Sequence, residues 1–405
     1  MNKKKIFNDP VYGFVNIPYN IIFDLIEHPY FQRLRRIKQL GLTDYVYPGA
    51  LHTRFHHALG AMHLMTQAID VLRSKGTEIT TKEAKAACIA ILLHDIGHGP
   101  FSHVLEHTLA NIHHEEISLL FMEELDRQFK GKLSLAIKIF KDEYDKPFLH
   151  QLISGQLDMD RMDYLTRDSF FTGVYEGVIG YDRIIKMLAV NDGNLVVEHK
   201  GVYSIEKFLV ARRLMYWQVY LHKTVVAAEQ MLVKVLERAK QLSKKETLKG
   251  VSEHLNFFLQ KDAGKPLGKK DKQTLLENFS QLDDFDVYNA LKSFVKSDDF
   301  LLSYMSKSIL DRKLFKIEFQ NKSFKGDYLE KLRQRAAKAF PINRQAAAQL
   351  IIQGQESNTV YTTSKEEILI LYKDGQVLPM SEISDFGLQS KNITKYYLCY
   401  PKNIS

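Results

Sequence analysis

Apolar residues recur at three- and four-residue spacing over most of residues 20–320, and this pattern constrains the fold more than any other feature. The segments AMHLMTQAIDVL and VVAAEQMLVKVLERAKQL show it plainly. Such spacing places the apolar side chains on one stripe of an α-helix, which must be buried against other helices. Glycine and proline separate these segments, as at Gly99–Pro100, which favours a helix end there. We therefore expect a mainly α fold.

The sequence changes in character after about residue 320. The stretch EEILILYKDGQVLPM, with Asp374–Gly375 near its centre, is typical of strand, turn and strand, and TVYTT and KYYLCY also favour strands. A chain of 405 residues is longer than the roughly 100–200 residues of a usual domain. We predict a helical domain over residues 1–320 and a small α+β C-terminal region over residues 321–405.

Composition bounds the class of protein. Hydrophobic residues make up 45% and charged residues 26% of the chain, which favours an ordered globular protein. There is no run of about 18 apolar residues, so we expect no membrane-spanning helix. The N-terminus lacks an apolar signal stretch, and Cys88 and Cys399 are too few for a disulfide framework. These features favour a cytoplasmic location.

The formal net charge of +8 favours anionic partners. Nucleotides, polyphosphate and weakly bound nucleic acid all fit this charge. Part of the excess lies in KDAGKPLGKKDK at residues 261–272. That segment is either a solvated loop or a phosphate-binding loop.

Histidines gather in one part of the chain, because most of the 15 lie between His52 and His114. His94 and Asp95 adjoin each other directly after the apolar segment AACIAILL. A carboxylate beside a buried helix is costly unless it is paired or metal-bound. Imidazole nitrogen and carboxylate oxygen together suit Mn²⁺, Fe²⁺, Zn²⁺ or Mg²⁺. For the dipeptide alone, the usual explanation is that His94 caps a helix and Asp95 pairs with a nearby arginine, so the dipeptide by itself is a weak signal of a metal site.

Two further segments offer metal ligands. TRFHHALGAMHL contains His56 and His57, and QLDMDRMDYLTRD contains four aspartates: Asp158, Asp160, Asp163 and Asp168. One histidine, the His-Asp pair and one distal aspartate would make a set of four mixed nitrogen and oxygen ligands. Spacing alone leaves open which histidine and which aspartate belong to it.

The order His, His-Asp, Asp resembles the HD superfamily of metal-dependent phosphohydrolases. Longer motifs resemble the deoxynucleoside triphosphate (dNTP) triphosphohydrolases of bacteria and their vertebrate relative with a SAM domain: NDPVYG, FQRLRRIKQLG, HDIGHGPFSH, DRMDYLTRD, YLHK and RKLFK. The resemblance runs from about residue 5 to about residue 320. It implies a helical HD-domain phosphohydrolase core whose metal ligands are His57, His94, Asp95 and Asp160.

The implied reaction is metal-dependent hydrolysis of a dNTP to a deoxynucleoside and inorganic triphosphate. The resemblance makes His103 the general acid, with His98 and His114 as supporting catalytic histidines. The implied phosphate-binding residues are Arg54, Arg161, Arg212 and Lys223. For the sugar, it implies that Tyr220 excludes a ribose 2′-OH, and that three residues bind the 3′-OH: Gln39, Tyr164 and Asp168.

Members of this family often form tetramers that nucleotides at subunit contacts activate. The residues that resemble this regulatory site are Lys5, Asn8, Glu27, Gln32, Arg35, Arg312 and Lys316. Glu27 departs from the vertebrate pattern, which has aspartate there, so the base of an activator is not specified. The alternative for FQRLRRIK is a basic, solvated helix face.

Two other functions compete with dNTP hydrolysis. A different HD phosphohydrolase, acting on nucleoside monophosphates or other phosphate esters, would share the metal site without needing Tyr220 or the arginines. A non-catalytic binder of nucleotides or single-stranded nucleic acid would bind in a strongly salt-dependent manner and would tolerate loss of the metal ligands. The complete ligand set argues against the binder.

Overall fold

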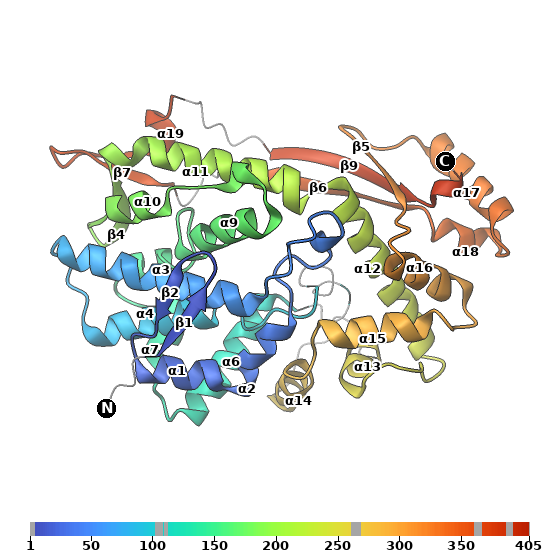
Figure 1. The fold of residues 1–405 in the computed structure, drawn as a ribbon, viewed down its shortest axis with the longest axis horizontal. Coiled ribbons are helices and arrows are strands. Elements are labelled where there is room, and N and C mark those ends of the chain that lie inside the picture. Colours follow the sequence, from blue (N-terminus) through green and yellow to red (C-terminus); the bar gives the residue numbers. More distant parts are fainter. Residues whose placement is uncertain are drawn as a thin grey trace.

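The computed structural model describes residues 5–101, 108, 112–260, 269–359, 367–385 and 392–404. Within these residues the protein is mainly α-helical with small sheets, as predicted (Figure 1). The helices are α1 (Asn20–Glu27), α2 (Pro29–Gln32), α3 (Arg54–Ser74), α4 (Thr81–Leu93), α6 (His114–Gln128), α7 (Ser134–Phe140), α8 (Pro147–Gln151), α9 (Met159–Thr172), α10 (Tyr181–Met187), α11 (Val202–Met215), α12 (Lys223–Ser243), α13 (Glu253–Gln260), α14 (Lys269–Phe279), α15 (Asp284–Phe294), α16 (Phe300–Leu310), α17 (Gly326–Ala339), α18 (Arg344–Ala348) and α19 (Met380–Ile383). The strands are β1 (Ile6–Asp9), β2 (Gly13–Asn16), β3 (Leu188–Asn191), β4 (Asn194–Glu198), β5 (Lys316–Gln320), β6 (Ile352–Thr359), β7 (Leu369–Leu371), β8 (Val377–Pro379) and β9 (Asn392–Tyr400).

Helix α4 is the most deeply buried part of the chain around the His-Asp pair. It packs between α3 and α7, and nearly all of its residues from Ala84 onward are buried. Its start is fixed by a capping box, in which Thr80 accepts from the Glu83 N–H and Glu83 accepts from the Thr80 N–H. Cys88 is buried within it, as expected of a small apolar side chain. The His94–Asp95 pair follows directly, so a rigid, buried helix carries it.

Helices α9 and α12 connect this body to the rest of the molecule. Helix α9 packs on α3, and α12 packs on α16 and β5. In Figure 1, α3, α4, α7 and α9 lie on the left, and α12, α13, α15 and α16 lie on the right. Strands β6 and β9 run along the top of the view towards α17 and α18. The start of α9 and one face of α12 both line the cavity described below.

The strands of the described residues form small sheets that join distant parts of the sequence. Strands β1 and β2 form an antiparallel hairpin, and β5, β9 and β6 form an antiparallel sheet. The other sheet has the order β3-β4-β7-β8, with β4 and β7 parallel. Segments before and after residue 320 therefore share two sheets.

The predicted C-terminal strands are present where the structure describes them. Strands β7 and β8 pair on either side of Asp374–Gly375, where Gly375 has a φ of +89°. KYYLCY lies in β9, whereas only the first residue of TVYTT, Thr359, is described. The β3–β4 hairpin was not predicted, although its turn contains Asp192–Gly193, both with positive φ.

No helix in the described ranges is both long enough and apolar enough to cross a membrane. The basic segment 261–272 lies largely outside the described residues, and α14 begins at Lys269 within it.

Candidate active site

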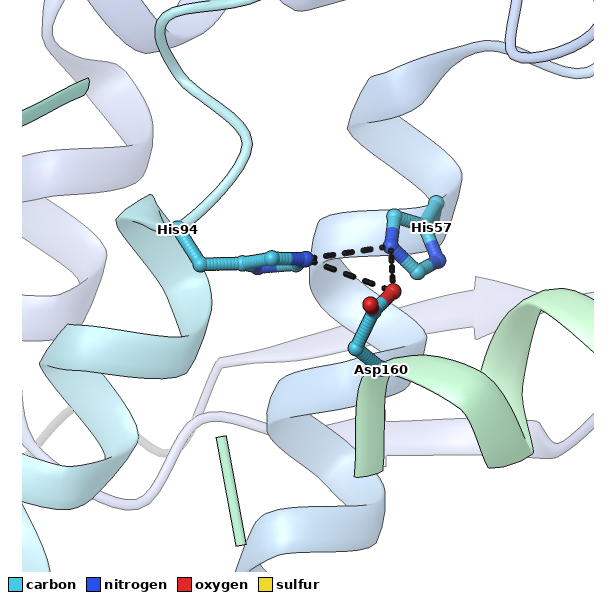
Figure 2. Close-up of side chains that lie close together, drawn as sticks. All are labelled: His57, His94 and Asp160. Carbon is cyan, nitrogen blue, oxygen red and sulfur yellow. Dashed lines mark hydrogen bonds and ion pairs between the residues drawn. The ribbon is translucent and has the colours of Figure 1, made fainter. Parts of the chain in front are cut away.

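Three side chains from three helices converge at one point (Figure 2). His57 lies in the first turn of α3, His94 follows the end of α4, and Asp160 lies in the first turn of α9. Asp160 Oδ1 lies 3.0 Å from His57 Nε2 and 3.4 Å from His94 Nε2. The two Nε2 atoms lie 3.4 Å apart. These atoms are close enough to one another to share a metal ion.

Asp95 contacts both histidines of this cluster. Its Oδ1 lies 3.4 Å from His94 Nε2, and its Oδ2 lies 3.7 Å from His57 Nε2. Arg54 also donates a hydrogen bond to Oδ2. Although burial opposes ionisation, His94 and Arg54 hold the pKa of the Asp95 carboxyl well below its usual range. Asp95 therefore makes both kinds of contact: the ion pair with an arginine that was expected without a metal, and the contacts with histidines that are expected of a metal ligand.

The donor set fits a divalent metal ion. His57 Nδ1 lies 2.7 Å from Asp163 Oδ2, and His94 Nδ1 lies 2.6 Å from the carbonyl oxygen of Ile91. Both partners are acceptors, so each Nδ1 is assigned as the N–H, and with a metal ion bound each Nε2 would present its lone pair to that ion. Burial opposes charging of His57, but hydrogen bonds to Asp160 and Asp163 raise its pKa to about 10. The site favours a positive charge among these groups, which a metal ion would satisfy.

The neighbouring candidates have other partners. The His56 ring accepts a hydrogen bond from the Thr53 N–H, within the capping box that begins α3. Asp158 caps α9 by accepting from the Arg161 N–H, and it also forms an ion pair with the Arg161 side chain. The structure thus brings His57 and Asp160 into the cluster and gives His56 and Asp158 capping roles.

The turn after Asp95 is held against α6. The Gly97 N–H donates to Ser118 Oγ at 2.9 Å, and Ser118 Oγ donates to the carbonyl of His94 at 2.7 Å. A Cβ at position 97 would overlap the His114 carbonyl, so this close approach requires glycine. The His98 ring stacks on His114, with centroids 4.0 Å apart. Burial, together with Arg54, holds the pKa of His98 well below its usual value.

The cluster opens onto a cavity of about 1150 Å³. Most of the predicted catalytic, metal-binding and substrate-binding residues line it: Gln39, Arg54, Asp95, His98, His114, Asp160, Arg161, Tyr164, Asp168, Arg212 and Tyr220. The volume slightly exceeds the roughly 300–1,000 Å³ of common small-molecule sites. The predicted acid, His103, lies outside the described residues.

Polar and aromatic groups meet on one wall of this cavity. The Tyr220 hydroxyl donates to Asp168 Oδ2 at 2.7 Å, and His52 Nε2 lies 2.8 Å from Asp168 Oδ1. Tyr164 packs edge-on against Tyr220, with centroids 6.1 Å apart. Gln39 Oε1 is buried, with no hydrogen-bond partner in the described part of the chain. A bound ligand could supply the donor that Gln39 lacks.

Lys223 is not placed where the sequence predicted. The resemblance implies that it binds phosphate, but it is exposed and does not line the cavity, whereas Tyr220, three residues earlier, does. Tyr220 ends a π-helical turn (Tyr216–Tyr220), and Lys223 begins α12 after His222, which has extended backbone. The three-residue spacing therefore does not place the two side chains on one face.

The residues that resemble a regulatory site lie in two groups. Lys5 Nζ lies over the Phe23 ring, and Gln32 Oε1 accepts from Arg35 Nε at 2.9 Å. Asn8, on β1, and Glu27, on α1, belong to the same N-terminal group, and both are exposed. Arg312 and Lys316 lie after α16 and in β5, on the opposite side of Figure 1 from β1. One chain does not bring the two groups together.

Sequence reasoning missed several residues around the site. Arg33 is fully buried and donates to the carbonyls of Ile96 (2.7 Å), His98 (2.9 Å) and Leu282 (3.0 Å), so it holds the turn that carries Asp95. Glu229 and Glu356 line the cavity from α12 and β6. The helical spacing of α12 could have indicated Glu229, but no pattern connects Glu356 to a site far away in sequence.

Comparison with known families defines the class of protein. Residues 54–168 match the HD domain, which contains the His57, His94, Asp95 and Asp160 positions, and residues 179–260 match an HD associated region. A fold of packed helices with a buried His/His-Asp/Asp cluster is therefore that of an HD-domain protein.

The chain belongs to the HD-domain phosphohydrolase family. It is 51% identical to a phosphohydrolase from Bacteroides thetaiotaomicron, whose crystal structure superposes with a TM-score of 0.94 over 98% of this chain and 100% of that one. It is 37% identical to the uncharacterized protein YwfO of Bacillus subtilis, covering 60% of this chain and 57% of that protein. The deoxynucleoside triphosphate triphosphohydrolase SAMHD1 homolog of Dictyostelium discoideum is 30% identical over 62% of this chain and 53% of its own length. The chain thus matches little more than half the length of these two relatives.

Proposed function

We propose that the protein hydrolyses dNTPs to a deoxynucleoside and inorganic triphosphate, with a divalent metal ion held by His57, His94, Asp95 and Asp160. The observation that carries this proposal is the cavity, in which the metal-binding cluster, three arginines and an aromatic wall are continuous. The Dictyostelium relative, named as a dNTP triphosphohydrolase, supports the substrate class. The ligand chemistry fits a group of divalent ions, Mn²⁺, Mg²⁺, Fe²⁺ and Zn²⁺, and does not distinguish among them.

Hydrolysis requires attack at the α-phosphorus and departure of O5′ with a proton. A divalent metal ion, when bound, supplies Lewis acidity towards a phosphoryl oxygen. Arg54, Arg161 and Arg212 bind the triphosphate, because guanidinium groups match phosphate geometry. We assign the proton donated to O5′ to His103, with His98 and His114 orienting the phosphates.

The aromatic wall selects the sugar. The Tyr220 ring fills the space beside C2′, while Asp168, Tyr164 and Gln39 bind the 3′-OH. The buried Gln39 Oε1 supports this assignment, because a sugar hydroxyl would supply its missing donor. Exclusion of a hydroxyl through lack of space and of partners discriminates against ribonucleotides.

We further propose nucleotide-activated assembly, with the protein acting in the cytoplasm as a homotetramer. The two groups of regulatory candidates are apart within one chain, as expected of a site completed by a second subunit. Nucleotide would then join Lys5, Asn8, Glu27, Gln32 and Arg35 of one subunit to Arg312 and Lys316 of another. Sedimentation with and without dNTPs tests this part separately from hydrolysis.

The reaction is tested by incubating the full chain with each dNTP and each NTP in Mn²⁺ or Mg²⁺, and separating products by anion-exchange chromatography. Deoxynucleoside with triphosphate is the expected result. Release of monophosphate or diphosphate from dNTPs, or turnover of nucleoside monophosphates alone, contradicts the proposal and favours another HD phosphohydrolase activity. The His94→Ala/Asp95→Ala double variant is the control for contaminating phosphatases.

A further inference from the structure

A buried chain of polar contacts joins the N-terminal hairpin to the metal-binding cluster. His57 Nδ1 lies 2.7 Å from Asp163 Oδ2. Arg167 donates from Nε to Asp163 Oδ2 and from Nη2 to Oδ1, both at 3.0 Å. Its Nη1 donates to Asp9 Oδ2 at 2.8 Å. His57, Asp163 and Arg167 are fully buried and Asp9 is 7% exposed, so water does not compete for these contacts.

Asp9 uses its two oxygens for different purposes. Oδ1 accepts from the N–H groups of Val11 (2.9 Å) and Tyr12 (3.0 Å), which shapes the turn between β1 and β2. Oδ2 accepts from Arg167. One carboxylate therefore fixes both the hairpin and the guanidinium that grips Asp163.

Gly60 leaves the space that this network occupies. It lies in α3, about one turn after His57, and a Cβ there would overlap both Asp163 Oδ1 and Arg167 Nη2. Glycine inside a helix costs about 1 kcal/mol relative to alanine. Its backbone needs no positive φ here, so close approach of the ion pair accounts for the glycine.

We propose that Asp9 and Arg167 are positioning residues for the metal ligand His57, acting through Asp163. Arg167 holds the Asp163 carboxylate at two points, and Asp163 accepts the Nδ1–H of His57, which keeps Nε2 directed at Asp160. Asp9 accepts a hydrogen bond from Nη1, on the other side of the same guanidinium group, and so fixes the position of the Arg167 side chain. This proposal rests on the proposed metal site, but it does not depend on which phosphate ester is hydrolysed.

A purely structural network would stabilise the fold without affecting metal affinity. Loss of a partner that contacts the ligand directly, as Asp163 contacts His57, typically weakens metal binding or activity by about 10–100-fold. Metal affinity, measured without substrate, therefore separates the two roles. It also separates failure of this proposal from failure of dNTP hydrolysis.

The test measures the Kd for Mn²⁺ by calorimetry on chelator-treated full-length protein. Asp9→Asn keeps the Oδ1 acceptor of the turn but removes the charge facing Arg167, and we expect about tenfold weaker Mn²⁺ binding. Asp163→Asn should weaken Mn²⁺ binding further, by up to about 100-fold. Asp24→Asn, at an exposed carboxylate on α1, is the matched control and should bind as the wild type does. A folded Asp9→Asn protein with unchanged Kd overturns the proposal.

A second variant carries the test if Asp9→Asn does not fold. Arg167→Lys keeps the charge but replaces the two-point grip on Asp163 by a point charge, so Mn²⁺ affinity should again fall. Melting curves with and without Mn²⁺ give the same answer, because weaker binding shrinks the rise in Tm that the metal causes. Equal rises in Tm for wild type and Arg167→Lys would mean that the network is structural only. Absence of binding by the wild type of all four ions, Mn²⁺, Mg²⁺, Fe²⁺ and Zn²⁺, would refute the metal site itself.

Discussion

The hydroxyl of Tyr220 donates a 2.7 Å hydrogen bond to Asp168, whose other carboxylate oxygen lies 2.8 Å from His52. Burial, together with Asp168, raises the pKa of Tyr220 well above its usual value, so the phenol remains a donor. The hydrogen bond thus fixes the hydroxyl end of the Tyr220 ring, and the backbone fixes the other end of the side chain. A ring held in this way cannot easily move aside to admit an additional hydroxyl.

Replacing Tyr220 by alanine should therefore raise the ratio of NTP to dNTP kcat/KM, even if total activity falls. The reason is that truncation opens the space beside C2′. Tyr220→Phe keeps the ring and loses only the hydrogen bond, so its ratio should stay near that of the wild type. If both variants lose both activities in proportion, with melting curves showing folded protein, the ring packs helices and does not select the sugar.

The His94→Ala/Asp95→Ala double variant should lose both bound metal and hydrolysis. Both side chains contact the point where His57 and Asp160 meet, and their loss removes half of the proposed ligands. Elemental analysis of purified protein gives metal per chain. Undiminished stoichiometry in the variant would place the metal elsewhere.

His103→Ala should bind Mn²⁺ and substrate but lose most of kcat. General acid catalysis typically contributes about 10²–10⁴-fold, which sets the expected loss. Steady-state kinetics, together with metal analysis, separates lost chemistry from lost binding. A decrease of less than about tenfold would show that another group protonates the leaving oxygen.

Much of the candidate site could be predicted because its motifs are local and their chemistry is specific. His94 and Asp95 end a buried helix, and that placement alone demanded a partner. The structure supplies two kinds of partner at once, the Arg54 ion pair and the histidine cluster. The mainly α fold followed from helical spacing, which depends only on neighbouring residues.

What could not be predicted depends on long-range packing or on local backbone irregularity. Glu356 enters the cavity from β6, whose place is fixed by pairing with β9 at the end of the chain. Asp9 and Arg167 are 158 residues apart, and no spacing rule connects them. The break between the π-helical turn that ends at Tyr220 and the start of α12 at Lys223 contains neither glycine nor proline, so nothing in the sequence signals it.

The stability of the protein should depend on pH through the side chain of Glu229. Its side chain is only partly exposed in the cavity wall, and burial, with a smaller effect of Glu356, raises its pKa to about 8. The unfolded chain releases this proton near pH 4.5, the usual value for glutamate, whereas the folded protein keeps it up to about pH 8. The stability that this proton contributes is therefore complete below pH 4.5 and is lost as pH rises through about 8.

Glu229→Gln removes that dependence because the amide is neutral throughout. The Tm of the variant relative to the wild type should therefore increase between about pH 5 and about pH 8.5, measured by calorimetry in one mixed buffer. Glu237→Gln is the matched control on the same helix, since that side chain is 44% exposed and paired with Lys234. Above about pH 8 the ionised Glu229 also adds a negative charge to the cavity that would hold a triphosphate in the proposed reaction. The wild-type KM for dNTPs should then rise more steeply with pH than that of Glu229→Gln, and parallel pH profiles for the two proteins would show that this carboxyl ionises as an ordinary surface glutamate does.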